Sequence, residues 1–329
     1  MSVIASPVRS RELDLRERVI TVLLTPEITL AIVLGLLVVV FTALNPVFLT
    51  WDTAQTILRS VSYIGIIAVG MSLLLVSGQF DLSVGSVAAL GAVTAGELML
   101  AGTPVIPAFM AGIVASGAIG ALNAVLTLYA HIPVLVVTLG TLYIARGMAL
   151  VVTGGQQISP LPESLLAFGE AEVLGLPYPV WIFLALAVAG YVILRHTKFG
   201  RSTYACGGNP VAARLAGLPV RRVQGLLFVL VSCLAGLAGI LIMARIQVGQ
   251  ASIGQGYELS VLAACVVGGV SLFGGRGSVL GAVLGVIFVQ VVSTGLVLAK
   301  VDPALQPVGI GAALLVAISL DVVRRQKAA

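Results

Sequence analysis

Residues 195–222 read RHTKFGRSTYACGGNPVAARLAGLPVRR and are the one long polar interruption in a chain that otherwise consists of apolar runs. This stretch carries six Lys or Arg residues and no acidic residue, so it cannot lie in hydrocarbon. Asn209 is a suitable helix N-cap, Pro210 suits a first helical turn, and Gly217 can adopt the left-handed conformation that ends a helix. We expect a short capped helix over residues 211–216 at a membrane face. An ordinary basic loop is the alternative.

The composition indicates a membrane protein. Of the 329 residues, 59% are hydrophobic and 9% are charged, and the mean hydropathy is +1.14, which is too apolar for an average soluble domain. Runs of about 20 apolar residues predict transmembrane helices, whereas a β-barrel would need short segments of alternating polarity. We therefore expect an all-α polytopic membrane protein. The net charge of +5 does not indicate nucleic acid, because the basic residues lie between the apolar runs.

About ten runs are long enough to be spans. They cover residues 28–44, 60–77, 84–101, 105–129, 133–152, 178–194, 223–244, 258–273, 278–298 and 304–322. Eight or nine spans remain possible, because the apolar stretches 78–129 and 258–298 are barely punctuated.

The distribution of charge supports an even number of spans. With ten, one side of the membrane receives the arm 1–26, the loop 194–222, Arg276 and the tail 324–329, which hold 14 of the 18 Lys and Arg residues. The positive-inside rule makes that side the cytoplasm, so both termini are expected there and residues 27–323 form the membrane domain. The long loop 153–177 contains three Glu and no Lys or Arg, as expected of a segment on the opposite side.

One short pattern occurs twice. Residues 80–84 read FDLSV and residues 257–261 read YELSV, each where a predicted span begins. An odd number of spans separates them, so the two copies would face opposite sides of the membrane. Inverted repeats of this kind are common in transporters and place the substrate path between the two halves. A chance match in an apolar sequence is the alternative.

Polar side chains within the apolar runs are candidates for a water-filled path, because a charge at the bilayer centre costs about 3 kcal/mol on insertion scales. The candidates are Asp81, Ser83, Asn123, Thr141, Arg146, Glu258 and Ser260.

Each candidate also has a simpler interpretation. Arg146 can extend to the membrane interface or pair with Glu97. Asn123 can bond to a neighbouring helix. Asp81 and Glu258 can cap the helices that they precede.

Other chemistry is not indicated. The chain has no P-loop, no His, Cys and carboxylate set at metal-ligand spacing, and no nucleophile placed beside a base, so we expect neither an enzyme nor a metal site. Gly277, Gly281 and Gly285 are spaced four residues apart, which favours a helix-packing seam over a phosphate cradle.

Four stretches together resemble the permease subunits of bacterial ABC sugar importers of the ribose and xylose type, within the larger group that includes branched-chain amino-acid permeases. They are SGQFDLSVGS (77–86), IPVLVVTLGTLYIARGMALVVTGG (132–155), KFGRSTYACGGNPVAARLAGL (198–218) and GYELSVLAACVVGGVSLFGGRGSVLG (256–281). The family pattern in the first stretch usually reads GGIDLSVGS, so Gln79 and Phe80 are departures. The resemblance covers essentially the whole chain.

The resemblance implies a multi-pass protein of the bacterial inner membrane that works with two cytoplasmic ATPases, a second identical or paralogous permease chain and an external sugar-binding protein. ATP and Mg would be used by the ATPases, and this chain itself would bind no cofactor. The family assigns the basic stretch to ATPase coupling. The coupling residues are then Asn209, Pro210, Ala213, Arg214, Leu215 and Gly217.

Other functions stay open beside this one. An ion-coupled secondary transporter would also suit inverted repeats, but it needs buried carboxylates, and the runs are nearly free of them. A permease for a branched-chain amino acid shares the same family. A membrane enzyme or anchor predicts a catalytic set or long soluble extensions, neither of which the sequence contains.

Overall fold

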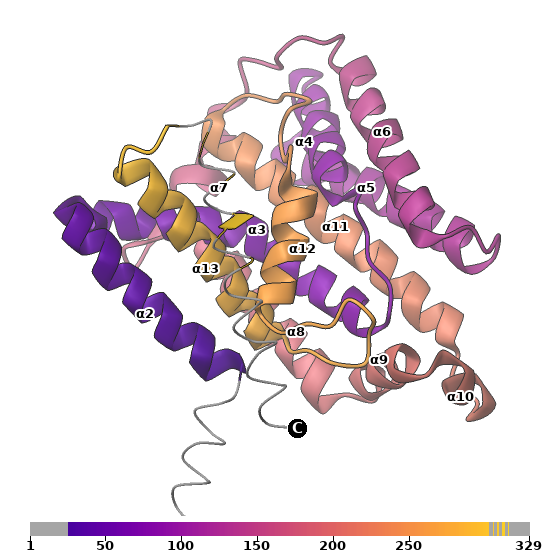
Figure 1. The fold of residues 1–329 in the computed structure, drawn as a ribbon. Helices are drawn as coiled ribbons and strands as arrows, with labels where there is room; N and C mark the ends of the chain where they lie inside the picture. Colours follow the sequence, from indigo (N-terminus) through magenta and orange to yellow (C-terminus); the bar gives the residue numbers. More distant parts are fainter. Residues whose placement is uncertain (1–25, 303–304, 306–307, 309–310, 313–314, 316–329) are drawn as a thin grey trace, which may run out of the picture.

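The computed structural model describes residues 26–302 together with 305, 308, 311–312 and 315, and this part is almost entirely helical (Figure 1). Seven of its helices are long and apolar enough to cross a membrane. The predicted all-α class is therefore confirmed. The predicted arm and tail and most of the tenth predicted span, 304–322, lie outside the described residues.

The elements fall into three groups. The long helices are α2 (Pro26–Leu44), α3 (Trp51–Val76), α5 (Val105–Leu128), α6 (Val134–Val152), α8 (Tyr178–His196), α11 (Val220–Ile246) and α13 (Val279–Leu298). Two shorter apolar helices are α4 (Val84–Leu100) and α12 (Tyr257–Val267). The connecting elements are η1 (Pro46–Leu49), η2 (Glu163–Leu165), α7 (Leu166–Glu170), β1 (Glu172–Val173), β2 (Leu176–Pro177), α9 (Lys198–Gly208) and α10 (Pro210–Leu215).

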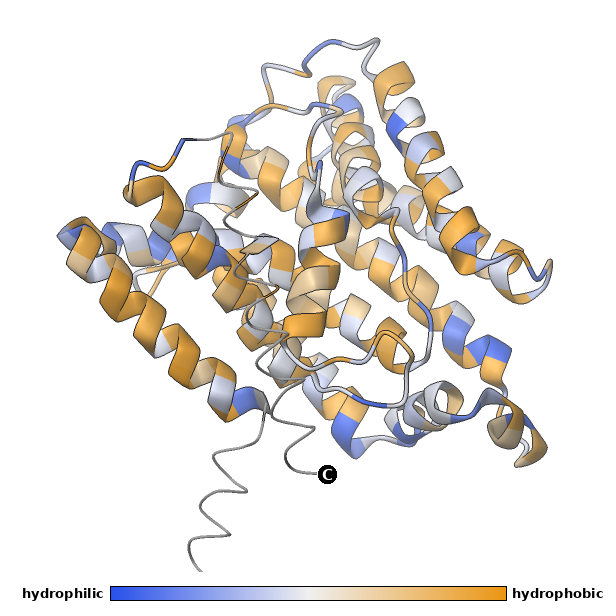
Figure 2. Cartoon of the chain, viewed as in Figure 1, coloured by the Kyte–Doolittle hydropathy of each residue, from blue (hydrophilic) through white to orange (hydrophobic). Residues whose placement is uncertain are grey.

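The centre of the molecule is formed by α3, α4, α5 and α11. Every residue of α3 from Val61 to Val76 is buried, and α11 contacts α3, α4 and α5. Small residues allow this contact, since a Cβ added to Gly239 of α11 would lie 2.0 Å from the Ala88 carbonyl oxygen of α4. By contrast α2 lies at the edge and exposes apolar side chains such as Leu36 along its length, as expected of a lipid-facing helix (Figure 2).

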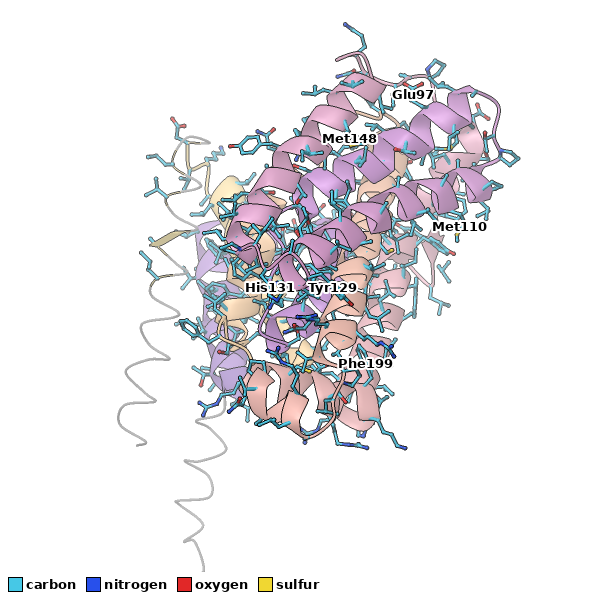
Figure 3. All side chains as sticks on the ribbon, turned by 90° about the vertical axis from the view of Figure 1, so that its right-hand side faces the viewer. Glu97, Met110, Tyr129, His131, Met148 and Phe199 are labelled. Atoms are coloured by element: carbon cyan, nitrogen blue, oxygen red, sulfur yellow. The ribbon has the colours of Figure 1, made fainter. Side chains whose placement is uncertain are left out.

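Two ends of the molecule can be defined by charge. The basic end carries residues 195–222, Arg276 and the α5–α6 loop, whose His131 Nε2 lies 3.2 Å from Arg221 Nη2. The far end carries residues 153–177. Glu97, near the end of α4, and Phe199 of α9 lie toward opposite ends of the molecule in Figure 3.

The first of two broken crossings consists of residues 77–83 followed by α4. Residues 77–83 leave the basic end of α3 as a non-helical segment that leads into the bundle (Figure 1). In the first turn of α4, the Val87 carbonyl accepts a hydrogen bond from Ser116 Oγ at 3.3 Å. Ser116 is the midpoint of the 24-residue helix α5, so α4 begins near half depth. Its 17 residues then extend about 25 Å to the far end.

The second broken crossing consists of residues 247–256 followed by α12, and it runs the opposite way. At the far end, Gly249 and Ile158 exchange backbone hydrogen bonds of 2.8 and 3.1 Å. The segment then descends until Gly254 reaches Gly85, whose added Cβ would lie 2.4 Å from the Gly254 carbonyl oxygen. α12 therefore begins at the depth where α4 begins.

The predicted span 258–273 is wrong, because α12 ends at Val267 and its 11 residues reach only about 16 Å. That is about half of a hydrocarbon core of ~30 Å. The following residues include glycines at positive φ, Gly269 at 84° and Gly274 at 86°, which turn the chain at the basic end. A non-helical segment and a half-length helix together replace one full span.

The internal repeat coincides with these breaks. FDLSV ends the first non-helical segment and enters α4 at Val84, and YELSV forms the start of α12 at Tyr257. The two helices run from the middle of the bundle toward opposite ends, as an inverted repeat requires. The copies differ by one turn, because the helix includes all of YELSV but only the last residue of FDLSV.

Two connections contain more structure than predicted. The basic stretch holds two helices instead of one, because α9 precedes the expected capped helix. On the far end, residues 172–177 form a small antiparallel ribbon, in which Glu172 pairs with Pro177. Arg59 of α3 forms a salt bridge of 3.2 Å with Glu172, and this holds the ribbon over α3.

Candidate functional site

A cavity of about 410 Å³ lies where the starts of α4 and α12 meet. Its polar lining includes Ser86 from α4, Arg146 from α6, Ser252 and Gln255 from the second non-helical segment, and Glu258 from α12. Leu142, Tyr143 and Leu150 of α6 form an apolar wall. The side chain of Tyr143 is 74% exposed, so the cavity opens on the α6 face of this chain.

Two polar atoms of this cavity lack hydrogen-bond partners among the described residues. They are Ser86 Oγ and Glu258 Oε2, and both atoms are shielded from solvent. The Ser86 side chain is 1% exposed. Gly85 gives Glu258 its room, since a Cβ at Gly85 would lie 2.2 Å from Glu258 Oε2. Buried polar groups are normally paired, so this pair is unusual.

Arg146 holds the second non-helical segment in place. Its Nη1 donates hydrogen bonds to the carbonyl oxygens of Ala251 and Ile253, the latter at 2.9 Å. These carbonyls have no helical partner because the segment is unwound. The predicted alternative in which Arg146 pairs with Glu97 is wrong, because no such pair occurs in the part of the chain that the structure describes. A positive charge in mid-span thus stabilises a break in a helix.

A second polar cluster lies at the first break. Asp81, with no exposed surface, accepts hydrogen bonds on Oδ1 from Ser83 N at 2.7 Å and Ser83 Oγ at 2.6 Å. Its Oδ2 accepts one from Asn123 Nδ2 at 3.0 Å. The interpretation of Asp81 and Glu258 as helix caps is wrong, because the N-cap of α4 is Ser83 and Glu258 is the second residue of α12. Asn123 of α5 bonds to a neighbouring element, as its simpler interpretation predicts. Asp81 and Asn123 are both buried away from the cavity.

The remaining path candidates are satisfied within their own helices. Thr141 Oγ1 donates to the Val137 carbonyl at 3.1 Å, and its side chain is 2% exposed. Ser260 Oγ donates to the Gly256 carbonyl at 3.1 Å. The structure thus brings Arg146 and Glu258 to one cavity and gathers Asp81, Ser83 and Asn123 elsewhere. Ser86, Ser252 and Gln255 were missed, because they lie in apolar or loop sequence without a charge.

Two of the three predicted seam glycines, Gly281 and Gly285, lie in a close helix contact. A Cβ at Gly281 would lie 2.1 Å from the Gly268 carbonyl oxygen, and one at Gly285 would lie 1.9 Å from that of Ala264, so both glycines allow α13 to pack against α12. Gly277 lies in the turn before α13, at φ 138°. No group of three or more His, Cys, Asp or Glu side chains in the described residues could hold a metal ion.

The capped helix in the basic stretch is α10, and its geometry matches the prediction. Asn209 Oδ1 accepts hydrogen bonds from Val211 N at 3.1 Å and Ala212 N at 3.0 Å, Pro210 is the first helical residue, and Gly217 has φ 81°. Ala213 is buried, whereas Leu215 is 86% exposed. The helix therefore presents an apolar side chain to its surroundings at the basic end. Arg214 Nε bonds to the Pro210 carbonyl at 3.3 Å.

Helix α9 joins α10 to both broken crossings through a glycine junction, formed by Gly78, Gly207, Gly274 and Gly275. A Cβ at Gly207 would lie 1.9 Å from the Val76 carbonyl oxygen and 2.6 Å from Gly275 N. The Val76 carbonyl itself accepts a hydrogen bond of 2.9 Å from Gly275 N. Three backbones thus meet in direct contact: the end of α3, helix α9 and the loop after α12.

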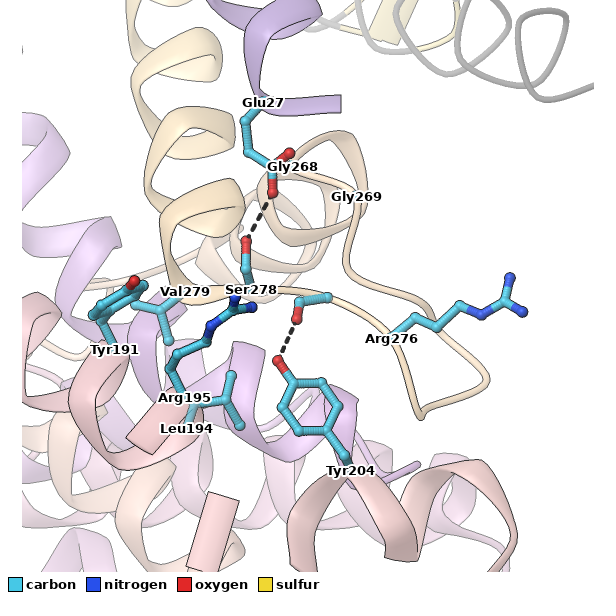
Figure 4. A pocket seen from close by; sticks show the side chains of 11 residues that line it. Glu27, Tyr191, Leu194, Arg195, Tyr204, Gly268, Gly269, Arg276, Ser278 and Val279 are labelled. Carbon is cyan, nitrogen blue, oxygen red and sulfur yellow. Dashed lines mark hydrogen bonds between the residues drawn. The ribbon is translucent and has the colours of Figure 1, made fainter. Parts of the chain in front are cut away.

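Tyr204 adds a second link between α9 and the same loop. Its hydroxyl donates a hydrogen bond of 2.7 Å to the Gly277 carbonyl, beside a cavity of about 350 Å³ (Figure 4). Burial raises the pKa of the Tyr204 hydroxyl above its ordinary value, against the opposing effect of the Arg195 charge, so the donor stays protonated. Ser278 on the same loop bonds to Glu27 of α2 at 3.2 Å.

Comparison with known proteins gives consistent results. Residues 53–318 match the family described as branched-chain amino acid transport system / permease component. The chain is 38% identical, over 86% of its length and 83% of the relative, to the L-arabinose ABC transporter permease protein AraH of Azospirillum brasilense. It is 35% identical to the ribose import permease protein RbsC of Bacillus subtilis, over 88% of this chain and 90% of the relative.

Two further comparisons extend these. The autoinducer 2 import system permease protein LsrC of Klebsiella pneumoniae is 37% identical over 93% of this chain and 89% of its own. Among solved structures, PsaBC from Streptococcus pneumoniae in complex with Fab has a similar fold, with a TM-score of 0.52 at 12% identity over 85% of this chain and 94% of that chain.

Proposed function

Because this chain belongs to the family described as the permease component of branched-chain amino acid transport systems, we propose that it is the membrane subunit of an ATP-binding-cassette importer for a monosaccharide or similar small polyol. The observation that carries the proposal is its identity of 34–38% to arabinose, ribose and autoinducer 2 permeases over most of both chains. The permease does no chemistry itself. It provides a path through the membrane that opens to one side and then to the other.

The basic end of the chain faces the cytoplasm in this proposal. Support comes from the positive-inside rule, because the basic stretch, Arg276 and the His131 loop lie together at this end. Both termini lie on the same side if residues 304–322 form a tenth span. The far-end ribbon then faces the periplasm or exterior, where a binding protein delivers the sugar.

A second permease chain, identical or paralogous, covers the open side of the cavity. The wall that opens there carries Arg146, Ser252 and Gln255, which are expensive to expose to lipid. A second chain across this face would enclose a water-filled path between the two copies. This arrangement keeps the polar lining out of contact with acyl chains.

A cytoplasmic ATPase subunit binds α10. The coupling residues are Asn209, Pro210, Ala213, Arg214, Leu215 and Gly217, of which Leu215 is the most exposed apolar group. ATP and Mg are used by the ATPase alone. Closure of the ATPase pair displaces α10 and α9, and the glycine junction passes that displacement to residues 77–83 and to the loop after α12.

Reconstitution tests the proposal. The chain is purified with the ATPase and binding protein encoded nearest to it and placed in proteoliposomes, and the uptake of radiolabelled L-arabinose, D-ribose and L-leucine is measured. We expect uptake of a sugar that requires ATP inside and binding protein outside. Uptake driven by an ion gradient without ATP, or uptake of leucine alone, contradicts the proposal.

A further inference from the structure

We propose that Glu258 and Ser86 form a binding subsite for sugar hydroxyl groups at the point where α4 and α12 begin. The proposal rests on the proposed sugar-import function and adds the residues that contact the sugar in transit. Its first support is a pair of shielded polar atoms, Ser86 Oγ and Glu258 Oε2, which have no partner among the described residues and belong to two residues that line the same cavity.

The donor and acceptor types suit a polyol. A carboxylate oxygen only accepts hydrogen bonds, and a serine hydroxyl both donates and accepts. A sugar hydroxyl does both as well, so it can donate to Glu258 while accepting from Ser86. Bonds to an ionised acceptor are about twice as strong as neutral ones, so Glu258 contributes the larger part.

The charges around the cavity favour a neutral ligand. Glu258 is negative, and the amino ends of α4 and α12, which carry partial positive charge, meet beside it. An anion would be repelled by the Glu258 carboxylate, and a cation would be repelled by both helix ends and by Arg146. A neutral sugar avoids both conflicts. Arg146 Nη1 is already engaged by the Ala251 and Ile253 carbonyls, so this nitrogen positions the wall of the cavity.

The geometry at Gly85 makes the subsite depend on the joint between the two broken crossings. Because a Cβ at Gly85 would lie 2.2 Å from Glu258 Oε2, the carboxylate position is set by the backbone of the opposite half. A relative movement of α4 and α12 would therefore change the separation of Ser86 and Glu258. The subsite would hold the sugar in one conformation of the permease and release it in the other, which keeps binding weak enough for transport.

Uptake measurements test the subsite in the complete transporter with saturating binding protein. The sugar is L-arabinose or D-ribose, whichever the wild-type complex takes up. We expect Glu258→Gln to lower the uptake rate about tenfold, because a neutral amide replaces the ionised acceptor, and Ser86→Ala to lower it about fivefold, because it removes a hydroxyl. Assembly with the ATPase and its basal hydrolysis should stay unchanged.

Two control variants separate this effect from loss of polarity or packing. Glu97→Gln neutralises a carboxylate near the far end of α4, and Ser72→Ala removes a buried hydroxyl that bonds to the Val69 carbonyl of its own helix at 2.8 Å. Both should transport like the wild type. Wild-type uptake in Glu258→Gln and in Ser86→Ala overturns the subsite and leaves the import function standing.

A binding measurement does not depend on transport. In a chain with Cys233→Ala, the exposed thiol of Ser252→Cys is alkylated with and without millimolar L-arabinose or D-ribose. We expect the sugar to slow alkylation, and Glu258→Gln to abolish that protection. Equal alkylation rates with either sugar overturn the subsite. A wild-type complex that transports leucine and no sugar overturns the import function and the subsite together.

Discussion

Asp81 is a carboxylate without exposed surface, and its environment explains how such a group is tolerated inside a membrane protein. It receives three hydrogen bonds, from Ser83 N, Ser83 Oγ and Asn123 Nδ2. Its role is to end the first non-helical segment, because it binds a backbone amide that lies before the start of α4. A polar residue in an apolar run can thus serve the fold even when it resembles a path residue.

Asp81→Ala should destabilise the protein by about 2–4 kcal/mol, because it leaves the buried backbone amide of Ser83 without an acceptor and removes one of the two acceptors of Asn123 Nδ2, the other being Ser83 Oγ at 3.1 Å. The measurement is thermal unfolding in detergent, with Glu97→Ala, which removes a carboxylate near the far end of α4, as the control. An unfolding temperature equal to that of the control would show that water replaces the carboxylate.

Gly207 and Gly208 provide a matched pair for the glycine junction. An added Cβ at Gly207 would lie 1.9 Å from the Val76 carbonyl oxygen, whereas one at Gly208 meets nothing within 4 Å. We expect Gly207→Ala to lower uptake by tenfold or more while ATP hydrolysis continues, because α9 is pushed away from both broken crossings. Gly208→Ala should transport normally. Equal uptake in the two variants would remove the junction from the coupling route.

Single residues were predicted well where the signal is local. Asn209, Pro210 and Gly217 define α10 because capping depends on neighbouring residues in the chain. The partners of Arg146 could not be predicted, because they are backbone carbonyls over 100 positions away that are free only where a helix is interrupted. Ser86 gave no signal, because a lone serine in an apolar run commonly bonds to its own helix.

Helix α12 illustrates why apolar runs overestimate spans. The residues after Val267 are nearly as apolar as the helix itself, so the run appeared continuous to residue 273. Gly269 at positive φ nevertheless ends the helix, and three more glycines at positive φ turn the chain before α13. Helix α3 shows the opposite error. The predicted span begins at residue 60, but the more polar residues 51–60, WDTAQTILRS, are helical too, and the helix begins at Trp51 with Thr50 as its N-cap. Helix ends follow backbone geometry more than hydropathy.

Leu215→Glu should separate the permease from its ATPase. The side chain is 86% exposed, so folding has no reason to change, but a charge would replace the apolar group that α10 presents. We expect the recovery of ATPase on purified permease to fall at least tenfold. Leu174→Glu is the matched control, since Leu174 is 88% exposed at the far end. Loss of ATPase in both variants, or in neither, would contradict the docking role of α10.

At the scale of the whole molecule, the structure shows how two predicted features, the spans and the repeated short pattern, are related. The class, most spans and the repeated FDLSV and YELSV pattern could be read from apolar runs and short matches. Their joint meaning could not, because depth in the membrane is a tertiary property. The two patterns lie at half depth, on helices that begin side by side and run to opposite ends. The two broken crossings thus place the repeat in the middle of the bundle and not at the membrane surface.

The proposed orientation of the molecule rests on its charge distribution, and labelling tests it. Glu163 and Glu170 are exposed at the far end, and Lys198 is exposed at the basic end. In a background lacking Cys206, Cys233 and Cys265, single cysteines are placed at these positions and treated in intact cells with a membrane-impermeant thiol reagent. We expect Glu163→Cys and Glu170→Cys to react and Lys198→Cys to react only after permeabilisation, because the proposal places the basic end in the cytoplasm. Glu97 lies toward the same end as the two glutamates. If the reagent reaches that end, Glu97→Cys should also react in intact cells. Labelling of Lys198→Cys in intact cells would place the basic end outside, which no ATPase could reach, and the proposed coupling through α9 and α10 would fail with it.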